Sequence, residues 1–259
     1  MRVVFIGAGR LATQLAKALK QGGHEVTQVY SRTMASASML ASQLGCEAVN
    51  EVGQVISDAD VYIVAVKDAA LAELIPQLCR DGRERQVWLH TAGSMPMALF
   101  AGHAAHYGVF YPMQTFSKEC AVDFRNIYCF LEANDSRAMS CAHALAESVS
   151  PHVVELSSEG RRYLHLAAVF ACNFANHCYA LSAEILAKQG LPFDAMLPLI
   201  DETARKVHEL SPAKAQTGPA VRYDENVLKA QSQLLSDRPD LQELYDRMSK
   251  SIYQTAKQQ

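Results

Sequence analysis

The chain lacks an excess of positive charge. Its 259 residues include 24 lysines and arginines against 27 aspartates and glutamates, which gives a formal net charge of −3. Proteins that hold a polyphosphate backbone carry a basic surface, so we expect no nucleic-acid partner. With 49% hydrophobic and 20% charged residues, the composition is that of an ordinary globular protein with one large domain or two modest ones.

The cysteines show neither pairing nor metal-ligand spacing. They are odd in number, widely separated and form no Cys-x-x-Cys motif: Cys46, Cys79, Cys120, Cys129, Cys141, Cys172 and Cys178. This pattern argues against a disulfide framework and does not indicate a zinc site. Unpaired thiols are typical of a reducing compartment, so we expect a cytoplasmic protein without a bound metal.

Long hydrophobic runs are scarce. The N-terminal run has only four apolar residues before a glycine, too few for the core of a signal peptide. Residues 163–183 carry no Asp, Glu, Lys or Arg, which could suggest a membrane-spanning helix. The segment nevertheless contains side chains that hydrocarbon penalises, namely His165, Asn173, Asn176, His177 and Ser182. We therefore predict a central helix of a soluble domain and no membrane association.

Strand-like and helical patterns alternate through the first half of the chain. Strands are predicted at 2–6, 25–30, 61–66 and 87–90, and helices at 10–21, 34–44 and 69–79. Repeated strand–helix–strand alternation is typical of a parallel sheet with helices on both faces. The first half is therefore predicted to be a doubly wound α/β domain.

The pattern changes near residue 156. Before it, short strands are predicted at 106–111, 127–132 and 153–156, with a helix at 136–148. After it, only helices are predicted, at 159–188, 194–210, 225–235 and 239–255, separated by glycine and proline turns. The predicted domains are an α/β domain of residues 1–156 and an all-helical domain of residues 157–259.

A glycine-rich turn, G-x-G-x-x-A, follows the first strand and opens a helix. Gly7 permits the tight turn, Gly9 lets backbone approach a pyrophosphate, and Ala12 lets the helix pack closely. The helix N-terminus adds free N–H groups. In this context the turn predicts a dinucleotide site formed by Gly7, Ala8, Gly9, Arg10 and Leu11. The alternatives are a helix entry that has lost its cofactor and, for Arg10, a solvated surface position.

No acidic residue stands at the end of the second strand, where an Asp or Glu would bind the ribose 2′-OH of NAD. The chain has Tyr30-Ser31-Arg32-Thr33 there. A hydroxyl and a guanidinium suit a 2′-phosphate. We therefore predict NADP(H) as the cofactor, with Ser31 and Arg32 on the 2′-phosphate.

The residues that follow the later strands face the same crevice in a doubly wound sheet. Val66 and Lys67 are predicted beside the adenosine half of the cofactor, and His90 and Thr91 beside the nicotinamide. For Lys67, a surface position at the start of a helix is an equally good interpretation.

Six motifs run through the whole chain: GAGRLA, AVKD, HTAGS, YPMQTF, LHLAAVFACN and TGPAVRYD. In these the chain resembles NADP-dependent oxidoreductases that join a Rossmann-like domain to a helical C-terminal domain of unknown function. Such proteins look like distant relatives of pyrroline-5-carboxylate reductase, deazaflavin-dependent NADP oxidoreductases and β-hydroxyacid dehydrogenases. The resemblance implies a Rossmann-type, mostly parallel sheet followed by a domain like the C-terminal domain of 6-phosphogluconate dehydrogenase. The chain departs from the pattern at Ala92, Tyr111 and Gln231, where Ser, His and His are more frequent.

Polar side chains gather on neighbouring faces of the uncharged helix. His165, Cys172 and Asn176 fall at i, i+7 and i+11, and Asn173 lies beside that line. Buried polar groups need partners, so these residues either complete core contacts or line a site. Because His165 and Asn173 lie in a motif of the resemblance, we predict His165 as proton donor and Asn173 as its orienting partner, with Thr91 beside the nicotinamide.

A loop near the C-terminus joins Thr217-Gly218-Pro219 to Arg222 and Asp224. The Thr217 hydroxyl and the Arg222 guanidinium could bind a substrate carboxylate. The equally good alternative is a surface pair of Arg222 with Asp224, in which Asp224 caps the following helix.

Together these features predict an NADPH-dependent reductase of a small polar carbonyl or imine, with the reaction at the seam between the two halves. Hydride transfer needs such a water-excluding place. A homodimer through the helical domain is expected, with the apolar helix from Tyr163 at the interface. The alternative is a non-catalytic NADP(H)-binding sensor or scaffold, which the departures at Ala92, Tyr111 and Gln231 favour slightly.

Overall fold

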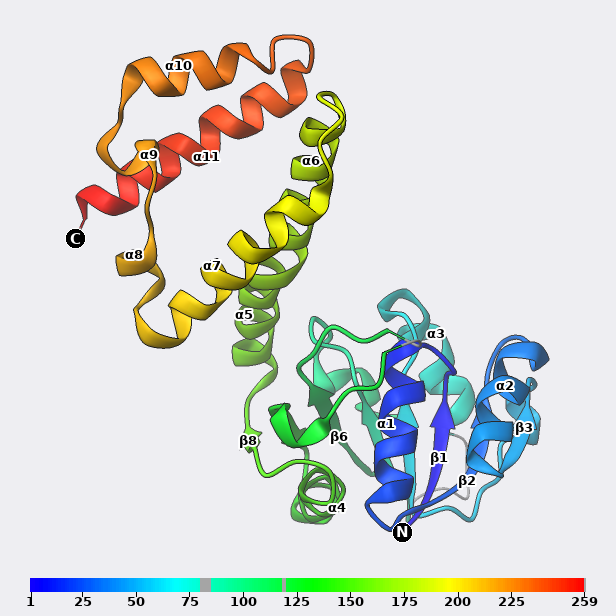
Figure 1. Cartoon of the computed structure of the whole chain (residues 1–259). Coiled ribbons are helices and arrows are strands. Elements are labelled where there is room, and N and C mark those ends of the chain that lie inside the picture. Colours follow the sequence, from blue (N-terminus) through cyan, green and yellow to red (C-terminus); the bar gives the residue numbers. More distant parts are fainter. Residues whose placement is uncertain (80–84, 118–119, 259) are drawn as a thin grey trace. The chain divides into compact units, whose positions relative to one another are not determined.

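The computed structural model describes residues 1–79, 85–117 and 120–258 (Figure 1). Contacts divide the chain into two compact units, Met1–Asn176 and His177–Gln259. The last strand ends at Glu155, and the described residues that follow form helices and loops. The predicted domain boundary at residue 156 stays a prediction, because this change in secondary structure and the division by contacts fall at different places.

The first unit is built on one eight-stranded sheet with the order β3-β2-β1-β4-β5-β6-β7-β8. Its strands are β1 (Arg2–Ile6), β2 (Glu25–Tyr30), β3 (Glu47–Val49), β4 (Val61–Val64), β5 (Val87–His90), β6 (His106–Pro112), β7 (Cys129–Ala133) and β8 (Val153–Glu155). All neighbours pair in parallel except β6 with β7. The predicted mostly parallel, doubly wound sheet is therefore confirmed. Its strand order reverses between β1 and β4, where such sheets bind ligands.

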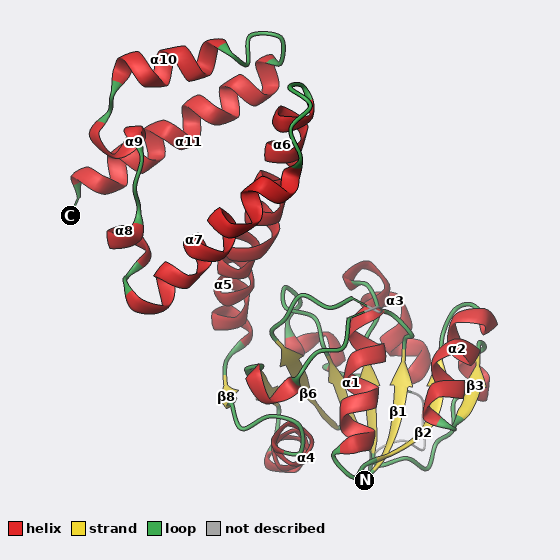
Figure 2. Cartoon of the chain, in the orientation of Figure 1, coloured by secondary structure: helices red, strands yellow, loops and turns green. Residues whose placement is uncertain are grey.

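Helices cover both faces of this sheet (Figure 2). The longer helices of the first unit are α1 (Arg10–Gln21), α2 (Met34–Leu44), α3 (Asp68–Leu78), α4 (Ser136–Glu147) and α5 (Ser158–Ala168). Short 3-10 turns lie at η1 (Val52–Gln54), η2 (Met97–Phe100) and η3 (Phe124–Asn126). Helices α1, α2 and α4 pack on one face, and α3 with η2 packs on the other.

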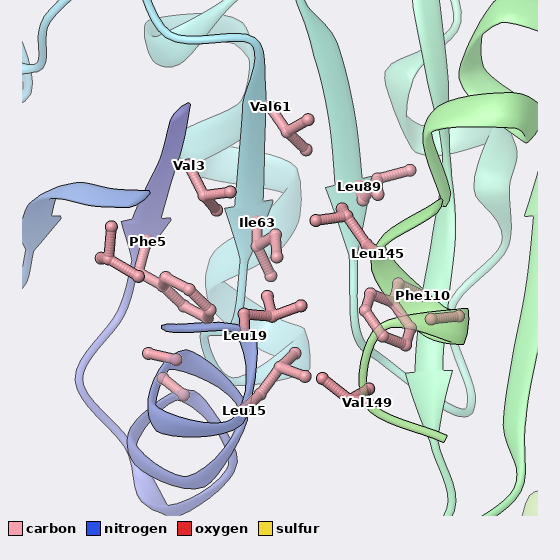
Figure 3. Close-up of a cluster of buried hydrophobic side chains, with 14 of the residues drawn as sticks. Val3, Phe5, Leu15, Leu19, Val61, Ile63, Leu89, Phe110, Leu145 and Val149 are labelled. Atoms are coloured by element: carbon pink, nitrogen blue, oxygen red, sulfur yellow. The ribbon is translucent and has the colours of Figure 1, made fainter. Parts of the chain in front are cut away.

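The core follows from the alternation of side chains along each strand. Val3 and Phe5 of β1 point to the face that carries α1, where they meet Leu15 and Leu19 (Figure 3). Val4 and Ile6 point to the opposite face. Because both faces are covered, β1, β4 and β5 are apolar almost throughout, as expected for central parallel strands.

The long uncharged segment is a helix interrupted by a wider turn. After α5, residues Val169–Phe174 (η4) form a π-helix, and α6 continues from Ala175 to Ala187. The helix begins where the Ser157 hydroxyl accepts a hydrogen bond from the Gly160 N–H. No helix within the described residues is long and apolar enough to cross a bilayer.

The second unit consists of helices. They are the main part of α6, then η5 (Phe193–Met196), α7 (Leu197–Glu209), α8 (Pro212–Ala215), α9 (Pro219–Arg222), α10 (Glu225–Gln233) and α11 (Pro239–Lys257). Proline stands in the first turn of α7, α8, α9 and α11, where its missing N–H costs nothing. The bounds of α7, α10 and α11 agree closely with the helices expected from the sequence, whereas the short helices α8 and α9 were not expected.

Candidate functional site

The turn after β1 is shaped by Gly7. Its φ is +119°, a conformation that other residues rarely adopt, and its N–H donates to the Tyr30 carbonyl at 2.7 Å. A Cβ at this position would lie 2.3 Å from the carbonyl oxygen of Ala65. Gly7 is therefore required by the fold itself, because the turn runs against the end of β4.

Gly9 differs from Gly7 because open space lies beside it. A Cβ built there would have no heavy atom within 4 Å, and both Gly9 and Arg10 are exposed. Gly9 stands at the N-cap position of α1, a helix of 12 residues whose first N–H groups point outward with a positive partial charge. Ala8 is buried and Leu11 half-buried, so these two residues offer backbone rather than side-chain groups. This arrangement fits a pyrophosphate that approaches close to backbone.

The other predicted cofactor residues follow the two strands that flank β1. Ser31 and Arg32 follow β2, and the Ser31 N–H donates to the Val49 carbonyl at 3.1 Å, while the Arg32 side chain is exposed. Half-buried Val66 and exposed Lys67 follow β4. Because β1, β2 and β4 are parallel, the fold brings these residues to the same edge of the sheet as the glycine turn. Their contacts with a cofactor stay a prediction.

Thr91 and His90, at the end of β5, are both buried. The His90 ring lies in the core: its Nδ1 accepts a hydrogen bond from the Ala92 N–H at 3.2 Å, and the ring stacks on Phe100 at 5.9 Å. Burial, helped by the nearby Arg161 charge, lowers the pKa of His90 to about 4. The imidazole is therefore neutral at physiological pH, and of His90 only the backbone lies at the strand end.

A buried ion pair joins α5 to the sheet. The Arg161 side chain is 1% exposed, and its Nη1 lies 2.6 Å from Oε2 of Glu132 in β7. Arg161 also donates to the carbonyls of Ala92 and Met95, at 3.3 and 2.6 Å. Burial alone would raise the pKa of Glu132, but hydrogen bonds from Ser158 and Arg161 outweigh it and hold the pKa below its usual value. This network fixes the start of α5 against the loop that follows β5.

One turn beyond Arg161, His165 meets Tyr111. The Tyr111 hydroxyl lies 3.1 Å from His165 Nδ1, and the two rings are nearly perpendicular, at 72°. Tyr111 stands near the carboxyl end of β6, next to β5 in the sheet. Burial raises the pKa of the Tyr111 phenol above its usual value, although Arg161 opposes the shift.

Gly93 leaves room for the contact between Tyr111 and His165. A Cβ at Gly93 would lie 2.6 Å from His165 Nδ1 and 3.1 Å from Cζ of Tyr111. A glycine is therefore needed for the loop after β5 to pass this close to both rings. Tyr111 and Gly93 were missing from the residues predicted for the site. The position of Tyr111 at the end of a strand beside β5 is the feature that could have indicated it.

The remaining predicted residues are exposed. Asn173 lies in the π-helix, a kind of bulge that is frequent at functional sites, and within the described residues no hydrogen bond joins it to His165. Thr217 and Arg222 belong to the second unit: Thr217 directly precedes Gly218, whose φ is +103°, and Arg222 is the last residue of α9. Asp224 stands at the N-cap of α10 without a side-chain capping bond. The roles of these residues stay predictions.

The fold and the glycine turn define a dinucleotide-binding protein of the Rossmann class. Residues 2–92 match the family described as NADP oxidoreductase, coenzyme F420-dependent, and residues 127–252 match the domain of unknown function DUF2520. A solved structure from Bacteroides fragilis, described as a “putative NADP oxidoreductase”, is 53% identical and covers 98% of each chain with a TM-score of 0.94. The chain belongs to this NADP oxidoreductase family. The predicted family and its cofactor, NADP(H), are confirmed.

More distant structures share the fold. A pyrroline-5-carboxylate reductase from Coxiella burnetii is 19% identical, with 99% of this chain and 97% of that chain covered and a TM-score of 0.60. An imine reductase from Myxococcus stipitatus, solved in complex with NADP+, is 18% identical, with 99% and 94% covered and a TM-score of 0.66. No curated protein matches the chain.

Proposed function

We propose that the protein is an NADPH-dependent reductase of a small polar carbonyl or imine. The observation that carries this proposal is the cluster of Tyr111, His165 and Gly93. It lies at the carboxyl ends of β5 and β6, on the same edge of the parallel sheet as the glycine turn. A histidine, a common general acid, thus stands at the edge of the sheet where doubly wound folds bind their cofactors.

The proposed cofactor-binding residues lie at the ends of four strands, β1, β2, β4 and β5. Gly7 shapes the turn, backbone N–H groups of Ala8 to Leu11 hold the pyrophosphate, and Ser31 and Arg32 hold the 2′-phosphate. Val66 and Lys67 flank the adenosine half, while His90, through its backbone, and Thr91 flank the nicotinamide. When bound, NADPH supplies the hydride. The structural relatives named as an imine reductase and a pyrroline-5-carboxylate reductase support a C=N acceptor.

His165 acts as the proton donor in this proposal. Its imidazolium gives a proton from Nε2 to the oxygen or nitrogen of the substrate and is left neutral. Asn173 orients the substrate by a hydrogen bond. Thr217 and Arg222 stay the candidate contacts for a substrate carboxylate, because a hydroxyl and a guanidinium occur together in their loop.

The test is NADPH oxidation at 340 nm with a panel of keto acids, aldehydes and cyclic imines. We expect one class to be turned over, and His165→Phe to lower the rate about 100-fold or more while NADPH affinity is kept. His208→Phe, an exposed histidine of the second unit, is the matched control. Tight NADPH binding without turnover across the whole panel would instead support a non-catalytic sensor or scaffold.

We also propose a homodimer through the helical region. Four large apolar side chains on α5 and the π-helix are exposed: Tyr163 (68%), Leu166 (53%), Phe170 (64%) and Phe174 (48%). A row of such side chains is typical of a protein–protein interface. A second copy of the chain is the occupant that the symmetry of most oligomers favours, because one patch can then cover itself.

A further inference from the structure

The two ring nitrogens of His165 have different surroundings. Nδ1 faces the Tyr111 hydroxyl at 3.1 Å, and Tyr111 is only 8% exposed. The His165 side chain as a whole is half-buried, and no hydrogen bond reaches its Nε2 from the described residues. One nitrogen is thus engaged by the protein, and the other is available to a ligand or to water.

We propose that Tyr111 is a positioning residue for His165: its hydroxyl donates to Nδ1 and so keeps the proton of the neutral imidazole on Nε2. The catalytic role of this hydrogen bond rests on the proposed reductase function, whereas the hydrogen bond and the position of the proton do not. The imidazole then presents an N–H to the substrate in its neutral form as well as in its charged form.

The direction of the hydrogen bond follows from the surroundings of the phenol. Burial raises the pKa of Tyr111, so the hydroxyl keeps its proton at neutral pH. If Nδ1 carried the proton, the Tyr111 oxygen would accept a hydrogen bond from Nδ1–H. The buried Tyr111 O–H would then have no acceptor in Nδ1. With the proton on Nε2, both groups are satisfied, because Tyr111 donates and Nε2 reaches water or substrate.

Other charged or titratable groups near Tyr111 do not supply a competing acceptor. Arg161 has no acceptor atoms, and its guanidinium already donates to Glu132 and to two loop carbonyls. Glu132 accepts hydrogen bonds from Ser158 and Arg161. The Cys172 thiol is exposed, and only its charge affects the pKa of Tyr111. Nδ1 of His165 is therefore the acceptor for the phenol.

The loop after β5 holds the pair in place. Arg161 binds the carbonyls of Ala92 and Met95, on either side of Gly93, and the same arginine anchors α5 one turn before His165. Because the loop and the helix share this anchor, the Gly93 backbone stays against both rings. Adding a Cβ at Gly93 would place an atom 2.6 Å from Nδ1 and force the rings apart.

The direct test is NMR of cofactor-free protein labelled with ¹⁵N in the histidine rings. In the neutral imidazole of His165 we expect a protonated Nε2 and an unprotonated Nδ1, and we expect a Tyr111 hydroxyl proton that exchanges slowly with water. The hydroxyl signal should disappear in Tyr111→Phe and in Gly93→Ala. Gly53→Ala is the matched control, because a Cβ there meets no atom within 4 Å. A proton found on Nδ1 of the wild-type protein would overturn the inference.

Kinetics separate positioning from a purely structural role. Tyr111→Phe should lower kcat about tenfold, leave NADPH affinity unchanged, and change the pH dependence of the rate. An unchanged pH profile would contradict the positioning role. The NMR result decides the position of the proton even if no compound of the panel is reduced, so failure of the reductase proposal is distinguishable from failure of this one.

Discussion

The two compact units bury their apolar residues very differently. In the first unit, the central strands β1, β4 and β5 are buried almost completely between two helical layers. In the described part of the second unit, the buried side chains are few and scattered: Ala220, Leu228, Leu235, Leu241 and Ser249. Large apolar residues such as Leu199 (62%) and Leu234 (79%) stay exposed there. The sheet has a complete core of its own, whereas the helices of the second unit leave large apolar side chains exposed.

The ion pairs also differ between the units in how deeply they are buried. The Arg161–Glu132 pair of the first unit is buried and joined to backbone carbonyls. Pairs of the second unit, such as Arg205 with Glu202, lie on exposed helix faces. Exposed pairs contribute little to stability, whereas breaking a buried pair leaves a charge without compensation. Substitutions at the buried pair should therefore lower the free energy of unfolding more than substitutions at the exposed pairs.

The largest effect is expected for Arg161→Met. It leaves Glu132 buried without its partner and should lower the free energy of unfolding by about 3 to 5 kcal/mol. Urea unfolding followed by the fluorescence of Trp88, the chain's single tryptophan and a core residue of β5, measures this. The double variant with Glu132→Leu should recover much of the loss, and Arg205→Met, at an exposed pair, should change the free energy of unfolding little. Equal losses for Arg161→Met and Arg205→Met would remove this contrast between the units.

Next in size is the effect of Phe170→Glu on association. A carboxylate in the exposed apolar row would have to be desolvated in a dimer, so the dimer dissociation constant should rise roughly 100-fold or more. Sedimentation velocity over a range of protein concentrations measures it. Met39→Glu is the matched control, because Met39 is 57% exposed on α2, outside the apolar row. A wild-type protein that sediments as a monomer at all concentrations would refute the dimer.

A smaller loss is expected for Arg32→Ala. Removing one charge-assisted contact with the 2′-phosphate should weaken NADPH binding by about 1.5 to 3 kcal/mol and leave NADH binding unchanged. Calorimetry with both nucleotides tests this, with Lys229→Ala as a control for a lost surface cation in the other unit. An equal loss of affinity for NADPH and NADH would show that Arg32 does not bind the 2′-phosphate.

The smallest effect concerns His143 of α4, whose ring nitrogens both lie 3.1 Å from carboxylates, those of Glu147 and Glu155. The hydrogen bond with Glu155, followed by that with Glu147, raises the pKa of His143. A raised pKa means that its stabilisation is fully present below about pH 6.5 and is lost as the pH rises through the folded-state pKa. His143→Gln should flatten the stability–pH curve in that window, measured by urea unfolding, whereas His103→Gln should not.

Much of the fold could be predicted because its segments carry strong local patterns. The helices Arg10–Gln21 and Met34–Leu44 begin and end as expected, and Gly45 ends the second in a left-handed conformation, with φ +69°. The strand Glu47–Val49 was missed, because three residues are too few to show a period. The π-helix at Val169–Phe174 was also missed, since its side-chain pattern does not differ from that of an ordinary helix.

The site was predictable in part for a related reason. Gly7, Gly9, Ser31 and Arg32 adjoin predicted strands, so a local rule brings them to one edge. The contact between Tyr111 and His165 joins residues 54 positions apart. It depends on how α5 packs on β6, and no short motif encodes that packing. His90 was expected beside the nicotinamide, but its ring lies in the core, because the strand alternation at β5 turns it inward.

NADPH titration calorimetry on Gly9→Val tests most directly the claim that the carboxyl edge of the sheet is the cofactor site. A Cβ at Gly9 meets no protein atom within 4 Å, so Trp88 fluorescence should report unchanged unfolding. The added side chain fills the space that the pyrophosphate needs, so NADPH binding should disappear. Undiminished NADPH affinity in a folded Gly9→Val protein would contradict the account.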